Sequence, residues 1–469
     1  MSYQHCFKDQ GKKVKKKKYI SFFHIFICLS FVLIGCQTNN FDVFNLGENI
    51  NYNDSINNKR HFSDLKLSVP KYKSFSSNNA QANVKKAIRA HPSFHRNVAS
   101  LEQRKSDIKQ VEASKESQIN FQALGGFSRA DEENQLGLTG SVNFVKVLYD
   151  YGAIDQAIKA EKHKIKSAEF EVVTEAERIG YLAYVNWINL LFERRIMDVY
   201  KKGIKNAEPL VEKIDQISLS GIADSTLILR ARKEYSETIV KMKQSEVLEQ
   251  KADANFINIF GLNETKNVGS IKPKSIKNYK YHENQMIKNS PNLKALRAFK
   301  KSLFISKESL VSQKNPNISL RAGINAPADD PIKNGSANVG FLLNYVYDDG
   351  GKLDAQIENV ENQINYSELN YNNALKELKL ELSVAFKAYK GALETKKNLI
   401  KLITLSENVR NNLNDQLSIG RAKLEDLLSA EVNLANNEIL LLNAERDLLL
   451  NSYKIYYLSV GFFPGSKWY

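Results

Sequence analysis

Cysteine is scarce in this 469-residue chain, and proline and glycine are few. The three cysteines, Cys6, Cys28 and Cys36, all lie in the first 36 residues, so we expect no disulfide in the rest of the chain. Nine prolines and 22 glycines are few for this length, which favours long helices. After Ile34, no apolar run reaches the length of a membrane-spanning helix.

Side chains that carry catalytic chemistry do not gather into a recognisable pattern. His91 and His95 are four residues apart, but Pro92 lies between them, so surface or turn roles are favoured over a shared metal site. Gly125–Gly126 lacks the strand, loop and helix context of a phosphate-binding loop. We therefore predict no catalytic, cofactor-binding or metal site, and we do not expect an enzyme.

The net charge of +15 does not indicate a particular binding surface either. Seven lysines lie in the first 35 residues, and the remaining charges are interleaved in sign along the helical segments. A nucleic-acid interface would gather lysine and arginine on one face. The pattern favours solvated helix faces, and we predict no nucleic-acid partner.

The first 36 residues carry the features of an export signal. Six lysines between residues 12 and 18 precede an apolar core, Tyr19–Ile34, that is short for a membrane span. The core ends in Leu33–Cys36, which resembles the bacterial lipoprotein box, in which the cysteine is acylated. The alternatives are a plain signal peptide or a membrane anchor. We predict a signal peptide over 1–35, a lipid on Cys36 and an irregular leader over 36–79.

Two junctions between strand and helix organise the rest. Residues 136–149 alternate between apolar and polar side chains, a period of two that predicts a strand. After Tyr149–Gly152 the period becomes seven, which predicts a long coiled-coil helix. The same change recurs around Tyr345–Gly351. We interpret the aspartates of both junctions as turn and cap residues.

These landmarks repeat with an offset of 199 residues, as Pro92 and Pro291 illustrate. The chain is therefore predicted to be two fused copies of one unit, helix, strand, strand, long helix, turn and long helix. The predicted parts are a first repeat over 80–261, a linker over 262–281, a second repeat over 282–461 and a tail over 462–469. We expect Gly203 and Pro209 to bend or interrupt the first long helix, the linker to be exposed and the tail to be irregular.

Four predicted strands each have one apolar and one polar face. Sheet edges cannot stay unpaired in lipid, and four strands are too few to enclose a wide lumen. The physical solution is an oligomer that closes a barrel, with the long helices continuing its wall as a tube. The residues expected to face lipid are Phe121, Leu138, Val142, Phe144, Leu320, Val339, Phe341 and Leu343.

Over residues 80–461 the chain resembles the TolC-type outer-membrane efflux family. The resemblance rests on the duplicated halves, the Tyr-Asp-x-Gly strand exits and Gly420 with Asp426–Leu428 and Ala430. It implies a homotrimer with a 12-stranded outer-membrane β-barrel, continued by a periplasmic α-helical barrel. It also implies that the helical turns meet a periplasmic adaptor. The turn residues concerned are Gly221, Ala223, Asp224, Gly420, Arg421, Ala422 and Lys423.

The resemblance also implies a constriction at the periplasmic tip. Asp426 corresponds to one of the family's gate carboxylates, although an exposed helix N-terminus favours an acidic residue anyway. Ser429 and Leu227 stand where the family has further carboxylates, and Ala422 stands where it has a basic residue. The predicted gate residue is therefore Asp426 alone.

The predicted function is passive export through a tripartite machine with a periplasmic adaptor and an inner-membrane transporter, either an ABC transporter or a resistance-type pump. Type I protein secretion is the first choice, because the strand exits look more like those of secretion components. Multidrug or metal efflux is the alternative. A structural coiled-coil lipoprotein or adhesin without a pore is the alternative from another class, and alternating strands count against it.

The lipoprotein box gives the first prediction. Changing Cys36→Ala removes the thiol that would take the lipid, so the variant should lose both acylation and normal signal processing. Metabolic labelling with a radioactive fatty acid in the producing cells measures this directly. Persistent labelling of the variant would contradict the assignment.

Overall fold

A computed structural model describes residues 79–130, 133–219, 225–262, 268–327, 335–464 and Trp468. They belong to one compact unit. The predicted signal peptide, Cys36 and nearly all of the leader lie outside the described residues, as does the turn that contains Gly221, Ala223 and Asp224.

The two halves have matching helices. Each helix of the first half begins and ends 199 positions before its counterpart in the second half, for example at 80 and 279. The pairs are α3 (Ala80–Ala90) with α7 (Tyr279–Asn289), α4 (Pro92–Ala113) with α8 (Pro291–Ser312), α5 (Ala153–Leu219) with α9 (Lys352–Ser418), and α6 (Ser225–Phe260) with α10 (Leu424–Ser459). This offset confirms the predicted duplication.

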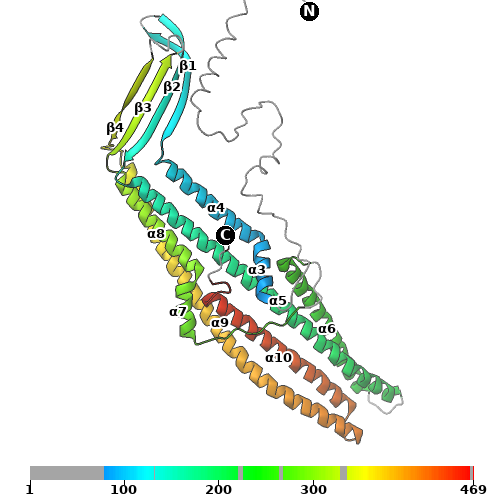
Figure 1. Cartoon of the computed structure of the whole chain (residues 1–469). Helices are drawn as coiled ribbons and strands as arrows, with labels where there is room; N and C mark the ends of the chain where they lie inside the picture. Colours follow the sequence, from blue (N-terminus) through cyan, green and yellow to red (C-terminus); the bar gives the residue numbers. More distant parts are fainter. Residues whose placement is uncertain are drawn as a thin grey trace, which may run out of the picture. The chain divides into compact units, whose positions relative to one another are not determined.

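The four strands form one antiparallel sheet in the order β1-β2-β3-β4 (Figure 1). They are β1 (Gln118–Ala130), β2 (Glu133–Tyr149), β3 (Asn317–Pro327) and β4 (Ser336–Asn344). The two halves therefore meet edge to edge at the pairing of β2 with β3. Within the described sheet, β1 and β4 each pair on one side only, so each has a free backbone edge.

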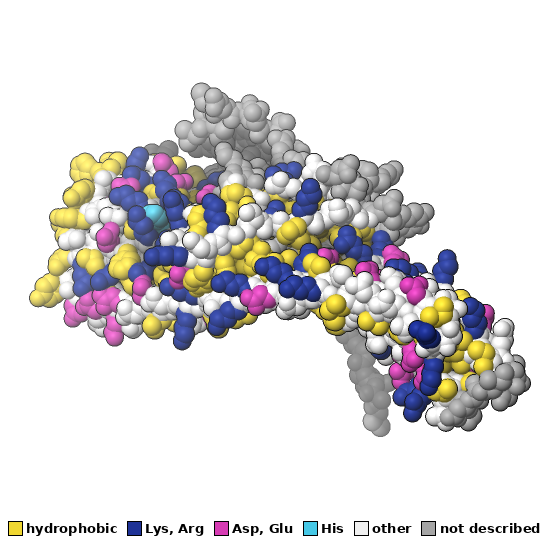
Figure 2. All heavy atoms as spheres, turned by 90° about the horizontal axis from the view of Figure 1, so that it is seen from below, with side chains coloured by type: hydrophobic (Ala, Val, Ile, Leu, Met, Phe, Trp, Pro, Cys, Tyr) yellow, Lys and Arg dark blue, Asp and Glu magenta, His cyan; other side chains and the backbone are white. Residues whose placement is uncertain are grey.

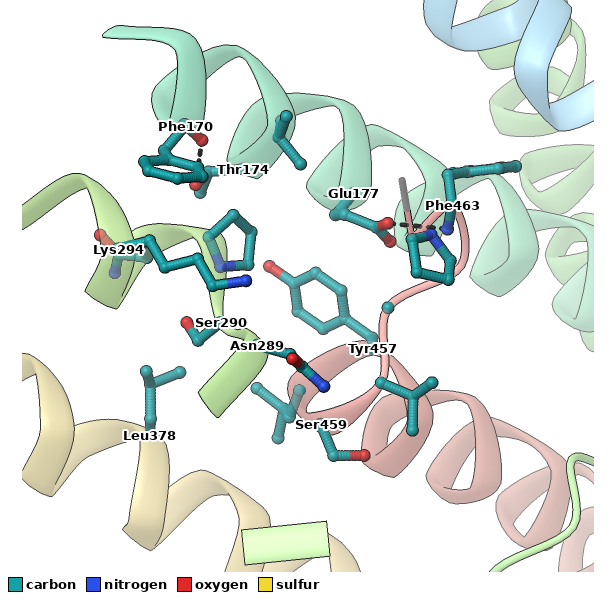
Figure 3. Close-up of a pocket in the computed structure, with 17 residues that line it drawn as sticks. Phe170, Thr174, Glu177, Asn289, Ser290, Lys294, Leu378, Tyr457, Ser459 and Phe463 are labelled. Atoms are coloured by element: carbon teal, nitrogen blue, oxygen red, sulfur yellow. Dashed lines mark hydrogen bonds between the residues drawn. The ribbon is translucent and has the colours of Figure 1, made fainter. Parts of the chain in front are cut away.

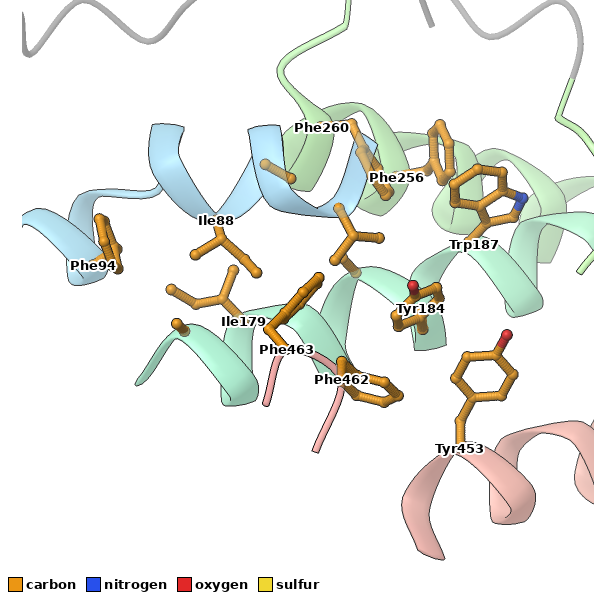
Figure 4. Packing of buried hydrophobic residues seen from close by; sticks show 14 of the residues in the cluster. Ile88, Phe94, Ile179, Tyr184, Trp187, Phe256, Phe260, Tyr453, Phe462 and Phe463 are labelled. Atoms are coloured by element: carbon orange, nitrogen blue, oxygen red, sulfur yellow. The ribbon is translucent and has the colours of Figure 1, made fainter. Parts of the chain in front are cut away.

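Helices α5 and α9 follow β2 and β4 in the chain. Each has 67 residues, which corresponds to a length of roughly 100 Å at 1.5 Å per residue. Helix α5 packs against α6, α8 and α10, and α10 also packs against α9. The largest hydrophobic cluster surrounds α5 near Ile179 and Trp187, where aromatic side chains from α6 and α10 converge (Figure 4). A second cluster sets small side chains such as Ala207 and Ala231 against Leu428.

The expected interruption of α5 does not occur. The helix runs unbroken through Gly203 and Pro209. Pro209 cannot donate a hydrogen bond to the carbonyl of Lys205, but both residues are exposed, so water can reach that carbonyl. Ala207 and Val211, on the opposite side, are buried and pack against the neighbouring helices.

The described part of the predicted linker, 268–281, contacts the helices more closely than predicted. The indole N–H of Trp187 donates to the carbonyl of Gly269 at 2.9 Å, and the hydroxyl of Tyr453 donates to the carbonyl of Lys272 at 3.2 Å. The ammonium of Lys274 lies within 6.0 Å of the ring centres of Tyr184, Tyr453 and Tyr456. These cation–π contacts replace solvation for a charge that is partly buried, and α7 already begins inside the predicted linker.

The first residues of the predicted tail are part of the core. Phe462 and Phe463 are buried, and their backbone N–H groups donate to the two carboxylate oxygens of Glu177 at 2.6 and 2.8 Å. Burial raises the pKa of Glu177, and the two hydrogen bonds oppose that rise. Gly461 has φ +79°, and a Cβ there would lie 3.0 Å from Glu177 Oε1, so this turn requires glycine.

A buried histidine joins α7 to α10. His282 Nε2 accepts the backbone N–H of Lys277 at 3.2 Å, so Nδ1 carries the proton and donates to Ser459 Oγ at 2.7 Å. Burial lowers the pKa of His282, and the nearby Lys277 lowers it further. The folded chain therefore favours the neutral imidazole.

This arrangement predicts a pH-dependent loss of stability. The folded-state pKa lies below the unfolded value of 6.5, so the unfolded chain gains its proton first as the pH falls below 6.5. His282→Gln should cost roughly 1–3 kcal/mol at pH 7.5, and the gap to wild type should narrow toward pH 5.5. Thermal unfolding followed by circular dichroism measures both values. Ser459→Ala, which keeps the imidazole, is the control, and a gap independent of pH would contradict the prediction.

Candidate functional site

The sheet register places most apolar side chains of the four strands on one face, while Leu124, Val145, Val147 and Leu342 lie on the other. Phe121 lies opposite Val142, and Val142 lies opposite Ile324 on the next strand. Farther along the same face, Leu320 lies opposite Phe341. Of the predicted lipid-facing residues, the register assigns Phe121, Val142, Phe144, Leu320, Val339, Phe341 and Leu343 to this face. Leu138 has the same register parity, and its side chain lies outside the described part.

This face is unusually exposed for apolar side chains. Phe121 and Val339 are each 78% exposed and Phe341 is 76% exposed. Such a patch on one side of a sheet marks an interaction surface, because exposed apolar area of this extent is unfavourable in water. The apolar face of the sheet would therefore be more stable against an apolar partner than in water.

The opposite face is more polar and contains a row of carboxamides. Asn120, Asn143, Gly323 and Asn338 lie opposite one another across the four strands. A Cβ on Gly323 would lie 3.1 Å from the side-chain oxygens of both Asn143 and Asn338. Glycine at 323 thus lets the two amide groups lean over the backbone of β3.

The strand exits are helix caps, as the sequence predicted. Asp150 Oδ1 accepts the N–H of Gly152 at 3.0 Å and Oδ2 accepts that of Ile154 at 2.7 Å. Asp349 does the same for Gly351 and Leu353, at 3.0 and 2.8 Å. Each carboxylate satisfies N–H groups that a helix N-terminus leaves unpaired.

An ion pair repeats beside each cap. Lys115, in the turn that follows α4, pairs with Asp155 at 2.8 Å. Lys314 pairs with Asp354 at the equivalent place in the second half. The hydroxyl of Ser309 donates to the carbonyl of Ala153 at 2.7 Å in a buried contact, which ties α8 to the first turn of α5. The sheet is therefore attached to the helices by matching contacts in both halves.

Four exposed tyrosines lie at the two strand exits. The sequence analysis did not identify them as a group. Tyr149, Tyr151, Tyr345 and Tyr347 are 53, 49, 54 and 91% exposed. The rings of Tyr149 and Tyr151 are 4.8 Å apart. Tyr151 adopts φ +55°, where the second half has a glycine, Gly350, at φ +68°. The signal was present in the two strand exits, each of which is rich in tyrosine.

The tip of the second half has the tight turn that was predicted. Gly420 adopts φ +71°, and the N–H of Arg421 donates to the carbonyl of Gln416 at 2.8 Å. Lys423 is the N-cap of α10, and Ala422 lies between these two basic residues.

Asp426 lies in the first turn of α10 and is exposed. Nearby, the hydroxyl of Ser429 donates to Glu234 Oε2 on α6 at 2.9 Å. Glu431 accepts from Arg410 on α9 at 3.1 Å. Ser429 stands where the resembled family has a carboxylate. Its partner Glu234 is 195 positions away, so no local sequence pattern indicates the contact.

A cavity of about 530 Å³ lies among α5, α8, α9, α10 and the tail (Figure 3). Lys294 and Tyr457 extend into it, and Glu177 lines it beside Phe463. Burial raises the pKa of Tyr457 to about 12 and lowers that of Lys294. Both carboxylate oxygens of Glu177 already accept backbone N–H groups, so this carboxylate is occupied by a structural role.

Of the two histidines considered in the sequence analysis, His91 has a structural partner. His91 is the N-cap of α4, and its Nδ1 accepts the N–H of Ser93 at 3.2 Å. Among the described residues, no group of three His, Cys, Asp or Glu side chains is arranged to hold a metal ion. The described helices include none that is both long and apolar enough to cross a membrane.

Together, the duplicated halves, the four-stranded sheet and the paired long helices define a class. The chain has the fold of the TolC-type outer-membrane channels, as the sequence resemblance predicted. No protein-family profile and no curated protein matches the sequence.

Three solved structures illustrate the likeness. CusC, described in terms of folding and transmembrane channel formation, has a TM-score of 0.73 at 13% identity, covering 84% of this chain and 96% of CusC. The outer membrane protein VceC from Vibrio cholerae has a TM-score of 0.71 at 16% identity, covering 82% of this chain and 97% of VceC. The CmeC outer membrane channel of Campylobacter jejuni has a TM-score of 0.71 at 14% identity, covering 92% of this chain and 95% of CmeC.

Proposed function

We propose that the protein is the outer-membrane duct of a tripartite export machine and acts as a homotrimer. The observation that carries this proposal is the two-faced sheet, whose apolar side chains are exposed and whose outer strands have free edges. In lipid every backbone N–H and C=O needs a partner, so three copies would pair β1 of one with β4 of the next. Twelve strands then close, with apolar side chains outward and the polar face inward.

The helices support the same arrangement. Within the described chain α6 does not pack against α9, and both helices expose large apolar side chains. Among them are Leu229, Val240 and Val247 on α6 and Leu369, Leu380, Leu402 and Leu405 on α9. Packing α6 of one copy against α9 of the next would cover them and continue the barrel wall as a helical tube. In Figure 2 the charges on the visible face are interleaved with hydrophobic side chains, which suits such a surface better than a nucleic-acid interface.

The strand exits support a position for the membrane boundary. Tyrosines favour the level where lipid meets water, since one end of the ring is apolar and the other can bind water. Tyr149, Tyr151, Tyr345 and Tyr347 supply such a level. The sheet would then lie in the outer membrane of a Gram-negative bacterium, with the helices in the periplasm and a lipid on Cys36 as a second anchor.

The partners follow from this orientation. The turns at Gly221 and Gly420 would be farthest from the membrane, so a periplasmic adaptor approaching end-on would meet them first, with an inner-membrane transporter behind it. Type I protein secretion is our proposal for the cargo, resting on the resemblance of the strand exits. Multidrug or metal efflux is the alternative. A structural lipoprotein or adhesin without a pore does not need the sheet.

The lipid-facing assignment can be tested by charge placement. Phe144→Asp and Phe341→Asp should reduce membrane insertion, because a charge facing lipid at mid-depth is destabilising, by roughly 2–4 kcal/mol for lysine or arginine and by less for aspartate. Asn143→Asp and Asn344→Asp, on the polar face, should insert normally. Membrane fractionation with heat-modifiability on gels measures assembly. Equal effects on both faces would count against the barrel.

The tip can be tested by conductance. Three copies of Asp426 around one axis would attract cations, so Asp426→Ala should lower cation selectivity and block by multivalent cations while trimers still form.

Bulky residues at Gly420 should impair export without affecting insertion, because the turn needs φ above zero. Reversal potentials in planar bilayers and cargo export measure these effects. Wild-type selectivity in Asp426→Ala would remove this residue from the gate.

A further inference from the structure

The strands carry very little charge where their side chains are described. Across residues 118–125, 139–149, 317–327 and 336–344 only two charged side chains occur, Lys146 and Arg321. The register places them on opposite faces. Lys146 lies opposite Leu320 on the apolar face, and Arg321 lies opposite Val145 on the polar face.

Arg321 is exposed and has space around it. On β4 its partner is Gly340, and a Cβ added to Gly340 would meet nothing within 4 Å. Among the described residues no carboxylate lies within salt-bridge distance of the guanidinium. An arginine is charged at any physiological pH, so the described part of this face carries one uncompensated positive charge per chain.

The neighbouring rows of the same face are neutral. Two residues along β3 lies Gly323, in the carboxamide row with Asn120, Asn143 and Asn338. Amide groups exchange hydrogen bonds with water and solutes of either sign, so they do not discriminate by charge. Any charge preference of this section of the sheet therefore falls to Arg321.

We propose that Arg321 is the specificity-determining residue of the strand-lined passage and makes that section favour anionic solutes over cationic ones. This inference rests on the proposed function, because it needs the polar face to enclose a lumen. In a trimer three guanidinium groups would face the same passage, with no carboxylate among the described side chains of the sheet to cancel them. The tip carboxylates at Asp426 would then act in series with a filter of opposite sign.

The magnitude follows from simple electrostatics. Three charges about 10 Å from a permeating ion in water, screened over a Debye length of about 10 Å near 0.1 M salt, change the anion-to-cation permeability ratio by about two- to fivefold. At about 1 M salt the Debye length is roughly 3 Å, and the preference should nearly vanish.

The test is the reversal potential of the purified full-length protein in planar bilayers under a potassium chloride gradient. Arg321→Gln should shift the permeability ratio toward cations by about two- to fivefold near 0.1 M salt, and Arg321→Lys should not. Lys146→Gln is the matched control. It removes the same charge one row away on the opposite face, and its channels should match wild type.

An Arg321→Cys channel gives an independent measurement after assembly. A trimethylammonium thiosulfonate reagent should restore the wild-type ratio, and a sulfonate-bearing reagent should move it further toward cations, with treated wild type as the control. An Arg321→Gln ratio equal to wild type, an equal shift in Lys146→Gln, or no response of the cysteine channel would each overturn the proposal while leaving the duct intact. A wild-type protein that inserts but conducts no ions would overturn the duct itself, and this inference with it.

Discussion

An antiparallel sheet with an exposed apolar face and two free edges is the constraint on which the rest of this structure depends. Four strands with such a face are not stable alone in water, and lipid would not satisfy the edges. The contacts at the strand exits connect the sheet to the helices. Asp150 and Asp349 fix the first turns of α5 and α9 directly below it. The ion pairs of Lys115 and Lys314 attach the preceding helices to the same turns.

Duplication explains how one chain supplies so regular a support. Every described helix has a counterpart 199 residues away, and so have the two caps and the two ion pairs. The halves also differ in two places. β4 ends at Asn344, whereas the equivalent strand β2 continues to Tyr149. Ser429 contacts Glu234 across the halves, so the tip is joined by contacts that are not themselves duplicated.

Periodicity was enough to predict the elements and their faces. The alternation around Val142 and Phe341 fixed which side chains share a face, and the sevenfold spacing of residues such as Leu427 and Leu434 predicted the long helices. Residues without a period could not be placed. The burial of Phe462 depends on Glu177, which is 285 positions away, and no local pattern links the two. The position of the Lys274 ammonium likewise depends on tyrosines that lie far away in the sequence, on α5 and α10.

The candidate site was predictable to the extent that it follows from the sheet. Arg321 and Lys146 could be assigned to faces by counting, but their isolation from carboxylates requires the pairing of strands. Continuous helicity through Pro209 was not predictable, because it depends on whether the carbonyl of Lys205 faces water or protein.

The contact between Glu177 and the segment after α10 has a consequence for the order in which the molecule can be completed. The core around Ile88 in α3 is closed by Phe462 and Phe463, and Gln81 donates to the carbonyl of Phe462 from 381 residues away. Chains emerge from the amino-terminal end, so α3 stays without its full set of neighbours until the segment after α10 has appeared. Slow, late closure of this kind is compatible with translocation across a membrane, since a chain that folds early is harder to thread through a narrow passage.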